Sequence, residues 1–327
     1  MGAYEQAVLV TGGTGFVGSH VVDVLLESGY EVRCSVRATS NLRWVEGKSV
    51  ELVEADLRGR GLAEAVAGVD AVVHCAGLTR GSTEALFAAN RDGTRVLLDT
   101  CERANRDIRF VFCSSQAAAG PGTLDRPRQI GDPPAPTSDY GRSKLAGEEE
   151  VLERGERLLV TILRPVAVYG PRDEDTLPYF QMAKRGVIVV PGVRERRVQL
   201  VHARDVATAL LAALRRPEAV GRTLFVGHPE ILSWDRLTAA IGEAVGRRAL
   251  RIRVPSAALL SAGAIAELLG SGKRSGQIDR RRAQDMAERA WTCDVEATLT
   301  ELGWQPEYDA VSGFRDTADW YRTEGWL

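Results

Sequence analysis

Strand-length runs of apolar residues alternate with longer amphipathic stretches through the first half of the chain. The apolar runs fall at 6–11, 31–37, 50–55, 70–76, 108–115 and 158–164, and helical patterns fall near 15–28, 61–67, 84–105 and 140–154. The runs are apolar on both faces, as parallel strands are when helices cover both sides of a sheet. This βαβ order predicts an α/β fold with a doubly wound, Rossmann-type parallel sheet.

The pattern becomes irregular after residue 171. A strand and a helix are predicted within 197–216, a further strand at 222–227, and mostly helix over 230–327. We therefore expect a dinucleotide-binding domain at 1–171, completed by about 198–227. The residues at 172–197 and 228–327 would form a smaller, mostly helical substrate-binding lobe, and a ligand is expected in the cleft between lobe and sheet.

Composition narrows the range of partners. The chain has 327 residues, 44% apolar and 26% charged, with a net charge of −2, so we expect a globular protein that does not bind nucleic acid. The four histidines lack metal-ligand spacing with another histidine, a cysteine or an acid, so no metal site is predicted. The five cysteines form no CxxC pair, and we expect them to be reduced, buried side chains.

Two features bear on location. The chain enters its first predicted strand almost at once, without a signal peptide. The longest apolar stretch, 254–270, contains Glu267 and is shorter than the roughly 20 residues that span a bilayer. We predict a helix there and no membrane span, and hence a cytoplasmic protein.

A glycine-rich turn joins the first predicted strand to the first predicted helix, in "VLVTGGTGFVGSHVVDVLL" at 8–26. It can be aligned as GxGxxG from Gly13 or as GxxGxxG from Gly12, with Gly15 and Gly18 shared. In this context the turn lets the backbone approach a pyrophosphate at the helix N-terminus, where side chains would obstruct it. The predicted cofactor-binding residues here are Gly12, Gly13, Thr14, Gly15, Phe16, Val17 and Gly18.

The end of the second predicted strand bears on the choice of dinucleotide. Many NAD-binding folds carry an acid there, which holds the ribose hydroxyls. This chain has Arg37 instead, and a guanidinium matches the oxygens of a 2′-phosphate. We therefore predict NADP in preference to NAD; the alternative is that Arg37 is a solvated charge at a strand end.

Tyr140 and Lys144 stand four residues apart in "SDYGRSKLAGEEE", and hence on one face of a helix. Two charges about 4 Å apart interact by up to roughly 4 kcal/mol at an effective dielectric constant near 20. A nearby ammonium would therefore lower a phenol pKa from about 10 toward neutrality, where acid–base catalysis is efficient. Such a pair also arises by chance, but Ser115 ends a predicted strand 25 residues earlier and could hold a substrate oxygen while Tyr140 moves its proton.

Further short motifs follow in a characteristic order. They are "TGGTGFVG", "ADL" with Asp56, "HCAG" (74–77), "NRDGT" (90–94), "SS" (114–115), "YGRSK" (140–144), "RPVAVYGP" (164–171), "VHARDVA" (201–207) and "LGWQP" (302–306). Through them, nearly the whole chain resembles the extended short-chain dehydrogenase/reductase family, also called the NAD-dependent epimerase/dehydratase family.

The resemblance implies a role for each matching residue. Gly12, Gly15 and Gly18 would form the pyrophosphate turn, Asp56 and Leu57 would approach the adenine, Ala76 and Gly77 would line the cofactor, and Pro165 would lie beside the nicotinamide. Tyr140 would be the acid/base and Ser115 the catalytic serine. Lys144 would bind the nicotinamide-ribose hydroxyls, and Asn90 would support the active-site end of its helix.

Departures from the family pattern bear on the substrate. "QAAAG" replaces the more usual "xxVYG" after the serines, and the paired asparagines of nucleotide-sugar members do not follow "YGP". "SVRATSNLRW" and "VQLVHARDVA" are more similar to the dihydroflavonol reductase and 3β-hydroxysteroid dehydrogenase branches. The resemblance therefore implies an oxidoreductase that acts on a ketone or secondary alcohol.

Several alternatives stay open from the sequence. One is a nucleotide-sugar epimerase or dehydratase with tightly bound NAD, and another is a non-catalytic NAD(P)-binding protein. The predicted helix at 254–270 is rich in small residues, which suit either ordinary packing or an apolar substrate pocket. Family members commonly dimerise, so a homodimer is also an expectation.

Overall fold

The computed structural model describes residues 6–104, 107–192, 194–255 and 288–327. Its centre is a seven-stranded sheet in which every neighbouring pair of strands is parallel. The strands are, in order across the sheet, β10 (Thr223–Val226), β6 (Leu159–Pro165), β5 (Arg109–Cys113), β4 (Ala71–His74), β1 (Ala7–Thr11), β2 (Glu31–Val36) and β3 (Val50–Glu54). The prediction of a doubly wound Rossmann-type sheet is confirmed.

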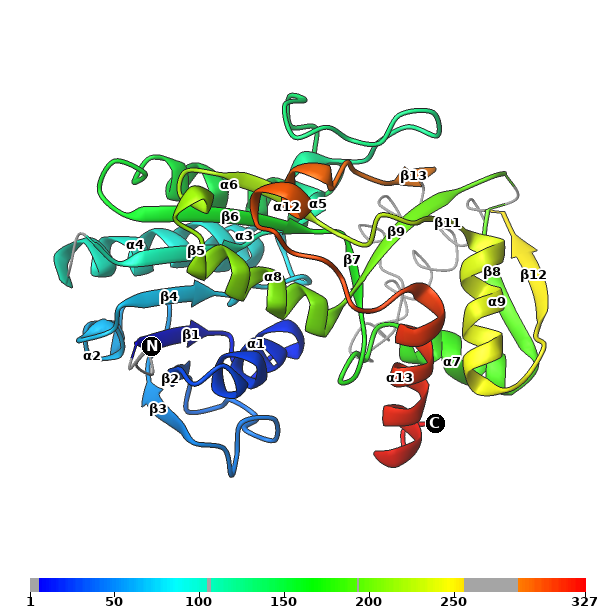
Figure 1. Ribbon diagram of the computed structural model, residues 1–327, viewed down its shortest axis with the longest axis horizontal. Coiled ribbons are helices and arrows are strands. Elements are labelled where there is room, and N and C mark those ends of the chain that lie inside the picture. The colour runs from blue at the N-terminus through cyan, green and yellow to red at the C-terminus, as the bar shows by residue number, and fades with distance from the viewer. Residues whose placement is uncertain (1–5, 105–106, 193, 256–287) are drawn as a thin grey trace.

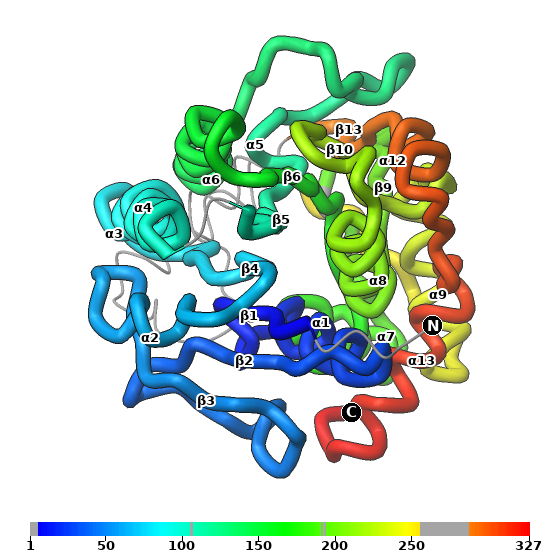
Figure 2. The backbone as a smooth tube through the Cα atoms, turned by 60° about the vertical axis from the view of Figure 1, so that its left-hand side comes forward, coloured from blue at the N-terminus to red at the C-terminus, as the bar shows by residue number. Residues whose placement is uncertain are grey.

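Helices cover both faces of this sheet. One face carries α1 (Phe16–Glu27) and α8 (Ala203–Arg215), and the other carries α2 (Leu62–Val66), α3 (Thr83–Phe87), the π-helical turn η1 (Ala88–Asp92), α4 (Gly93–Ala104) and α6 (Asp139–Leu152). Figure 2 shows α3 and α4 on one side of the strands and α8 on the other. The short helix α5 (Gln116–Ala119) follows β5.

The two-sided covering explains why the strands lack a polar face. In β1, the side chains of Val8 and Val10 enter the core shared with α1 and α8, whereas Leu9 enters the core shared with α4 and α6. All three are fully buried. Successive residues of a strand point to opposite faces, so a strand between two cores must be apolar at every position.

The remaining elements form two smaller sheets and a third core, beside one end of the large sheet (Figure 1). The strands are β7 (Ala167–Tyr169), β9 (Arg197–His202), β11 (Ile231–Ser233) and β13 (Ala290–Trp291) in one sheet, and β8 (Val187–Pro191) and β12 (Leu250–Val254) in the other. The helices of this part are α7 (Leu177–Lys184), α9 (Trp234–Val245) and α13 (Ala310–Thr323). The 3₁₀ turn η2 (Pro217–Ala219) and α12 (Glu296–Glu301) pack instead against the large sheet, beside α8 and β10.

The segment predicted to complete the dinucleotide-binding domain is shared between these parts. β10 joins the large sheet and α8 packs on α1, whereas β9 pairs within a smaller sheet. The division into a cofactor domain and a substrate lobe stays a prediction. The predicted helix at 254–270 lies outside the described residues from 256 onward, and Val254 belongs to β12.

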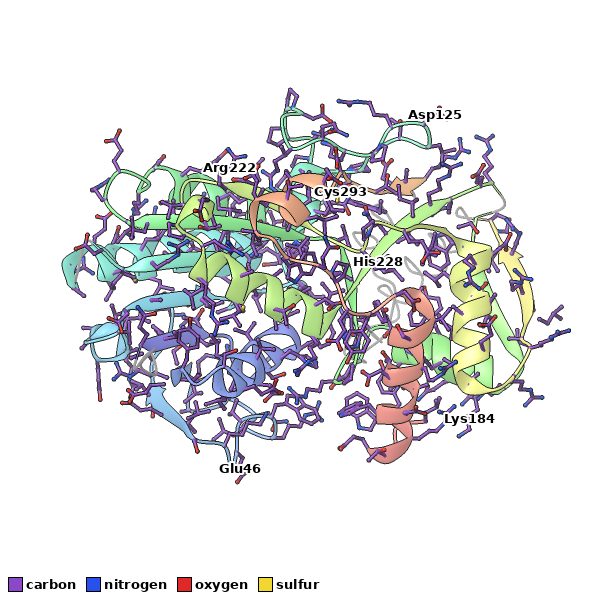
Figure 3. All side chains as sticks on the ribbon, viewed as in Figure 1. Glu46, Asp125, Lys184, Arg222, His228 and Cys293 are labelled. Carbon is purple, nitrogen blue, oxygen red and sulfur yellow. The ribbon has the colours of Figure 1, made fainter. Side chains whose placement is uncertain are left out.

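One buried side chain connects the small sheet to two neighbouring segments. Gln199 on β9 accepts a hydrogen bond from the backbone N–H of Cys293 (2.9 Å) and donates one to the carbonyl of His228 (2.8 Å). Figure 3 labels His228 and Cys293 between the large sheet and the smaller elements. Within the described residues, no helix has the length and apolar character needed to cross a membrane.

A buried ion pair ties α6 to the large sheet. Arg164 on β6 donates two hydrogen bonds to the carboxylate of Glu148 on α6, from Nε to Oε1 (2.9 Å) and from Nη2 to Oε2 (2.6 Å). Their side chains are only 8% and 1% exposed, and the Ser114 hydroxyl donates to the same carboxylate. Removing one member of such a pair leaves the other charge buried and uncompensated.

We expect Glu148→Ala to lower the free energy of unfolding by about 3–5 kcal/mol, because Arg164 would lose its counter-charge in the core. Urea denaturation followed by circular dichroism measures the change. The control is Glu149→Ala, an exposed neighbour on the same helix, for which we expect a change within about 0.5 kcal/mol. Equal effects of the two substitutions would contradict this account of the ion pair.

Candidate functional site

The glycine-rich turn between β1 and α1 is shaped by close backbone contacts. Gly12 has a φ of +73°, and a Cβ atom there would lie 2.7 Å from the backbone nitrogen of Ala76. A Cβ atom on Gly18 would lie 2.1 Å from the carbonyl oxygen of Gly12. Only glycine fits these two positions.

The N-terminus of α1 suits an anion. Gly15 is its N-cap and has no side chain with which to cap the first turn, which also contains no acidic residue. The free N–H groups of a helix N-terminus, together with the helix dipole, attract phosphate oxygens. The residues from Gly12 to Gly18 therefore fit the pyrophosphate of a dinucleotide.

The ends of β2 and β3 lie beside this turn at the same edge of the sheet. The N–H of Ala55 donates to the carbonyl of Val36 (2.9 Å). The residues that follow these two, Arg37 and Asp56, are therefore neighbours. Arg37 is exposed, and its backbone forms a tight turn with Ser40. The Asp56 carboxylate accepts a hydrogen bond from the N–H of Arg58 (2.8 Å) and so shapes its own turn, next to Leu57.

The segment after β4 continues the same edge. The N–H of Cys75 donates to the carbonyl of Thr11 (3.0 Å), which places Ala76 against Gly12. A Cβ atom on Gly77 would lie 2.6 Å from Oδ1 of Asn90. The structure thus places Ala76 against the glycine-rich turn and Gly77 against Asn90.

Asn90 holds the segment after β4 and helix α6 together. Its Oδ1 accepts from the N–H of Leu78 (2.8 Å), and its Nδ2 donates to the carbonyl of Leu78 (2.8 Å) and to the Ser143 hydroxyl (2.9 Å). The residue lies in the π-helical turn η1, which interrupts the helix predicted over 84–105. Such turns are frequent at functional sites.

His74 is a structural residue beneath this edge. Its ring is fully buried between the hydroxyls of Thr11 (2.6 Å from Nδ1) and Thr94 (3.0 Å from Nε2). Burial, with a smaller effect from the charge of Lys144, lowers its pKa to about 3, so the ring is neutral near neutral pH.

Ser115 and Tyr140 begin two helices that touch. Ser115 is the N-cap of α5, where its hydroxyl accepts from the N–H of Ala117 (3.2 Å). Tyr140 lies in the first turn of α6, which Ser138 caps. A Cβ atom on Gly141 would lie 2.3 Å from the carbonyl oxygen of Ala117, so the two helix starts are in backbone contact. Ser115 and Tyr140 are both half-buried.

Lys144 lies one turn farther along α6 and is only 5% exposed. Its Nζ donates to the carbonyl of Cys113 (2.8 Å) and lies 4.1 Å from the centroid of the Phe112 ring. Burial lowers the pKa of Lys144 below its ordinary value, while the neighbouring Cys113 and Glu148 oppose this effect. The ammonium is thus held at the end of β5, two residues before Ser115.

The Pro/Gly-rich loop that leads to Tyr140 is docked on both sides. The N–H of Ala135 donates to the carbonyl of Ala119 (2.9 Å) at its end. In its middle, Gly122 and Arg128 donate to the carbonyls of Ala290 (3.0 Å) and Thr292 (2.9 Å). Figure 1 shows this loop above α5, close to β13.

Pro165 ends β6 and is buried opposite Val226 of β10. It thus also lies at the carboxyl edge of the sheet, where open α/β sheets bind their ligands. All the predicted site residues therefore lie at this edge or just beyond it.

Sequence reasoning missed three features: the bond from Asn90 to Ser143, the Ser114–Glu148–Arg164 cluster, and the placing of Cys75 beside Cys113 on the same face of β4 and β5. A signal existed for Glu148, because it lies four residues after Lys144 and therefore on the same buried helix face. The cysteine pair had no comparable signal, because the two residues are 38 positions apart.

Comparison with known proteins agrees with this geometry. The model of the NAD dependent epimerase/dehydratase family matches residues 8–227. A ceramide reductase from Caulobacter vibrioides is 31% identical over 98% of this chain and 96% of its own. A UDP-glucose 4-epimerase from Vibrio cholerae is 26% identical over 96% of this chain and 94% of its own.

Among solved structures, the crystal structure of gox2253 is similar over 98% of this chain and 99% of its own, with a TM-score of 0.82 and 28% identity. The resemblance noted from the sequence is thereby confirmed. The chain belongs to the NAD-dependent epimerase/dehydratase family of extended short-chain dehydrogenases/reductases.

Proposed function

We propose that this protein is an NAD(P)-dependent oxidoreductase that interconverts a ketone and a secondary alcohol. The observation that carries the proposal is the convergence of Ser115, Tyr140 and Lys144 at the edge of the sheet that also holds the glycine-rich turn. In this proposal the nicotinamide cofactor, when bound, supplies or accepts the hydride. The chain's own residues then have to bind the substrate oxygen and move its proton.

Each of the three residues has a place in that task. Ser115 holds the substrate oxygen by a hydrogen bond, and Tyr140 gives or takes the proton of that oxygen. Lys144 keeps a positive charge beside them, which favours the phenolate form of a neighbouring tyrosine. Its position is fixed by the carbonyl of Cys113 (2.8 Å). Asn90 acts as a positioning residue through Leu78 and Ser143.

Two lines of support favour a ketone or alcohol over a sugar nucleotide. Nucleotide-sugar members of the family usually carry paired asparagines after the "YGP" motif, and this chain has none directly after Tyr169–Pro171. The relative from Caulobacter vibrioides is a ceramide reductase, and a ceramide is a lipid with long apolar chains. An apolar small-molecule substrate is therefore part of the proposal.

A nucleotide-sugar epimerase is the second candidate, favoured by the similarity to a UDP-glucose 4-epimerase. An epimerase regenerates its cofactor within one turnover, whereas a reductase consumes it. A panel of ketones, aldehydes and sugar nucleotides, with absorbance of the reduced cofactor as the readout, separates the two. Net consumption with ketones supports the proposal; epimer formation without net consumption would replace it.

For Tyr140→Phe we expect turnover to fall by about 10²–10⁴-fold, because the proton donor is lost while the ring is kept. Steady-state kinetics measures the loss, and cofactor fluorescence tests whether binding survives. Tyr308→Phe is the control, since Tyr308 stacks on His202 and is not one of the three proposed catalytic residues. A Tyr140→Phe protein with undiminished turnover would exclude Tyr140 as the acid/base.

The pH dependence of alcohol oxidation tests Lys144. Lys144→Met removes the ammonium and so disfavours the phenolate form of Tyr140. In the plot of oxidation rate against pH, the midpoint of the rise from the acid side should therefore move up by about one pH unit or more. Because burial lowers the pKa of Lys144, the wild-type charge is lost at a lower pH than that of an exposed lysine. The wild type should therefore show an alkaline decline that the variant lacks. Superimposable profiles would argue against this role.

Arg37 tests the choice of cofactor. We propose NADP as the preferred dinucleotide, because the exposed guanidinium after β2 is free to meet a 2′-phosphate. Arg37→Ala should weaken NADP binding by about 10–100-fold and leave NAD binding nearly unchanged. Arg60→Ala, at an exposed site paired with Glu54, is the control for lost surface charge. Isothermal titration would refute the preference if the wild type bound NAD more tightly than NADP.

A further inference from the structure

Two cysteines meet at the carboxyl ends of neighbouring strands, within the candidate site but outside its proposed chemistry. The parallel pairing of β4 and β5 ends with His74 opposite Phe112. The next residues are Cys75 and Cys113, and both side chains pack against the core that the sheet shares with α1 and α8, so they lie on the same face of neighbouring strands. Neighbouring strands lie about 4.8 Å apart, within the roughly 4.4–6.8 Å between Cα atoms that a disulfide spans.

These two thiols differ from the other three. As residues, Cys75 and Cys113 are half-buried, whereas Cys34, Cys101 and Cys293 are buried, so the expectation of five buried cysteines is wrong for this pair. The hydrogen bond from Cys75, helped by the charge of Lys144, holds the pKa of the Cys113 thiol below its ordinary value, although burial opposes this. A thiol that ionises more readily, with a second thiol in reach, is the arrangement in which oxidation ends in a disulfide.

We propose that Cys75 and Cys113 form a site of reversible oxidation, at which a peroxide closes a disulfide between β4 and β5. The Cys113 sulfur attacks one peroxide oxygen, the O–O bond breaks, and one water leaves with a sulfenic acid formed. The Cys75 sulfur attacks that sulfur, the S–S bond forms, the S–O bond breaks, and a second water leaves. The two thiols lose two electrons and two protons, and the peroxide takes them up.

The disulfide would act on the catalytic residues through the backbone. The carbonyl of Cys113 accepts the hydrogen bond of Lys144, and Ser115 lies two residues farther on. Ala76 and Gly77 follow Cys75 directly. Drawing the sulfurs to a bond length of about 2.05 Å therefore shifts both segments. Loss of turnover on oxidation rests on the proposed function, whereas formation of the disulfide does not.

The test is a peptide map of the full chain. The wild type is treated with hydrogen peroxide, its remaining thiols are alkylated, and the unreduced digest is analysed by mass spectrometry. We expect one linked pair of peptides, carrying residues 75 and 113, that disappears after dithiothreitol. Cys75→Ser and Cys113→Ser should lack it, and Cys101→Ala, a buried cysteine on α4, should retain it.

The outcomes separate the inference from the proposed function. The inference is overturned if both cysteines are alkylated after peroxide treatment. It is also overturned if Cys113 becomes a sulfinic acid while Cys75 is alkylated. The wild-type map alone decides between these outcomes if a variant fails to fold. Once a ketone substrate is known, its turnover should fall by about tenfold or more when the protein is oxidised by peroxide, and should return with dithiothreitol. A linked peptide without such a fall would overturn the effect on catalysis. If no substrate turns over, the proposed function fails, and the peptide map still judges the disulfide.

Discussion

The candidate site depends on how closely helix α6 approaches its neighbours. A Cβ atom at Gly141 would lie 2.3 Å from the carbonyl oxygen of Ala117, and one at Gly147 would lie 2.3 Å from that of Asn90. Any side chain at either position would push the helix away. Because both are glycines, α6 rests directly on α5 and on η1, and Tyr140 and Lys144 are brought to the ends of the strands.

Buried polar contacts then hold the helix in that place. Glu148 pairs with Arg164 on β6, Lys144 reaches the carbonyl of Cys113 on β5, and Ser143 bonds to Asn90 in η1. These contacts lie on one buried face of α6 and point to three different elements. A helix held in this way cannot rotate without leaving a buried charge or donor unsatisfied, which is costly. The proposed acid/base is therefore held by a rigid support.

Much of the fold could be predicted from the sequence, because its strands lie between two cores and must be apolar throughout. The boundaries of β2 and β3 differ from the predicted ones by a single residue at the C-terminal end. The candidate site could be predicted where a motif needs a particular residue, as at Gly12 and Gly18. Contacts between residues far apart in the chain could not, because neither Asn90 nor Cys75 carries a local sign of its partner. The π-helical turn likewise leaves no mark in the hydrophobic pattern.

The docked loop before Tyr140 makes the start of α6 sensitive to a distant part of the chain. Gly122 and Arg128 are bonded to the backbone at 290–292, and the same loop ends at the Ser138 cap. The segment at 290–293 is itself joined to β9 through Gln199. A substrate that shifts β9 or β13 would thus pull on the first turn of α6. For the proposed enzyme we therefore expect that substitutions that change the length or the anchoring of this connection alter selectivity without touching the substrate.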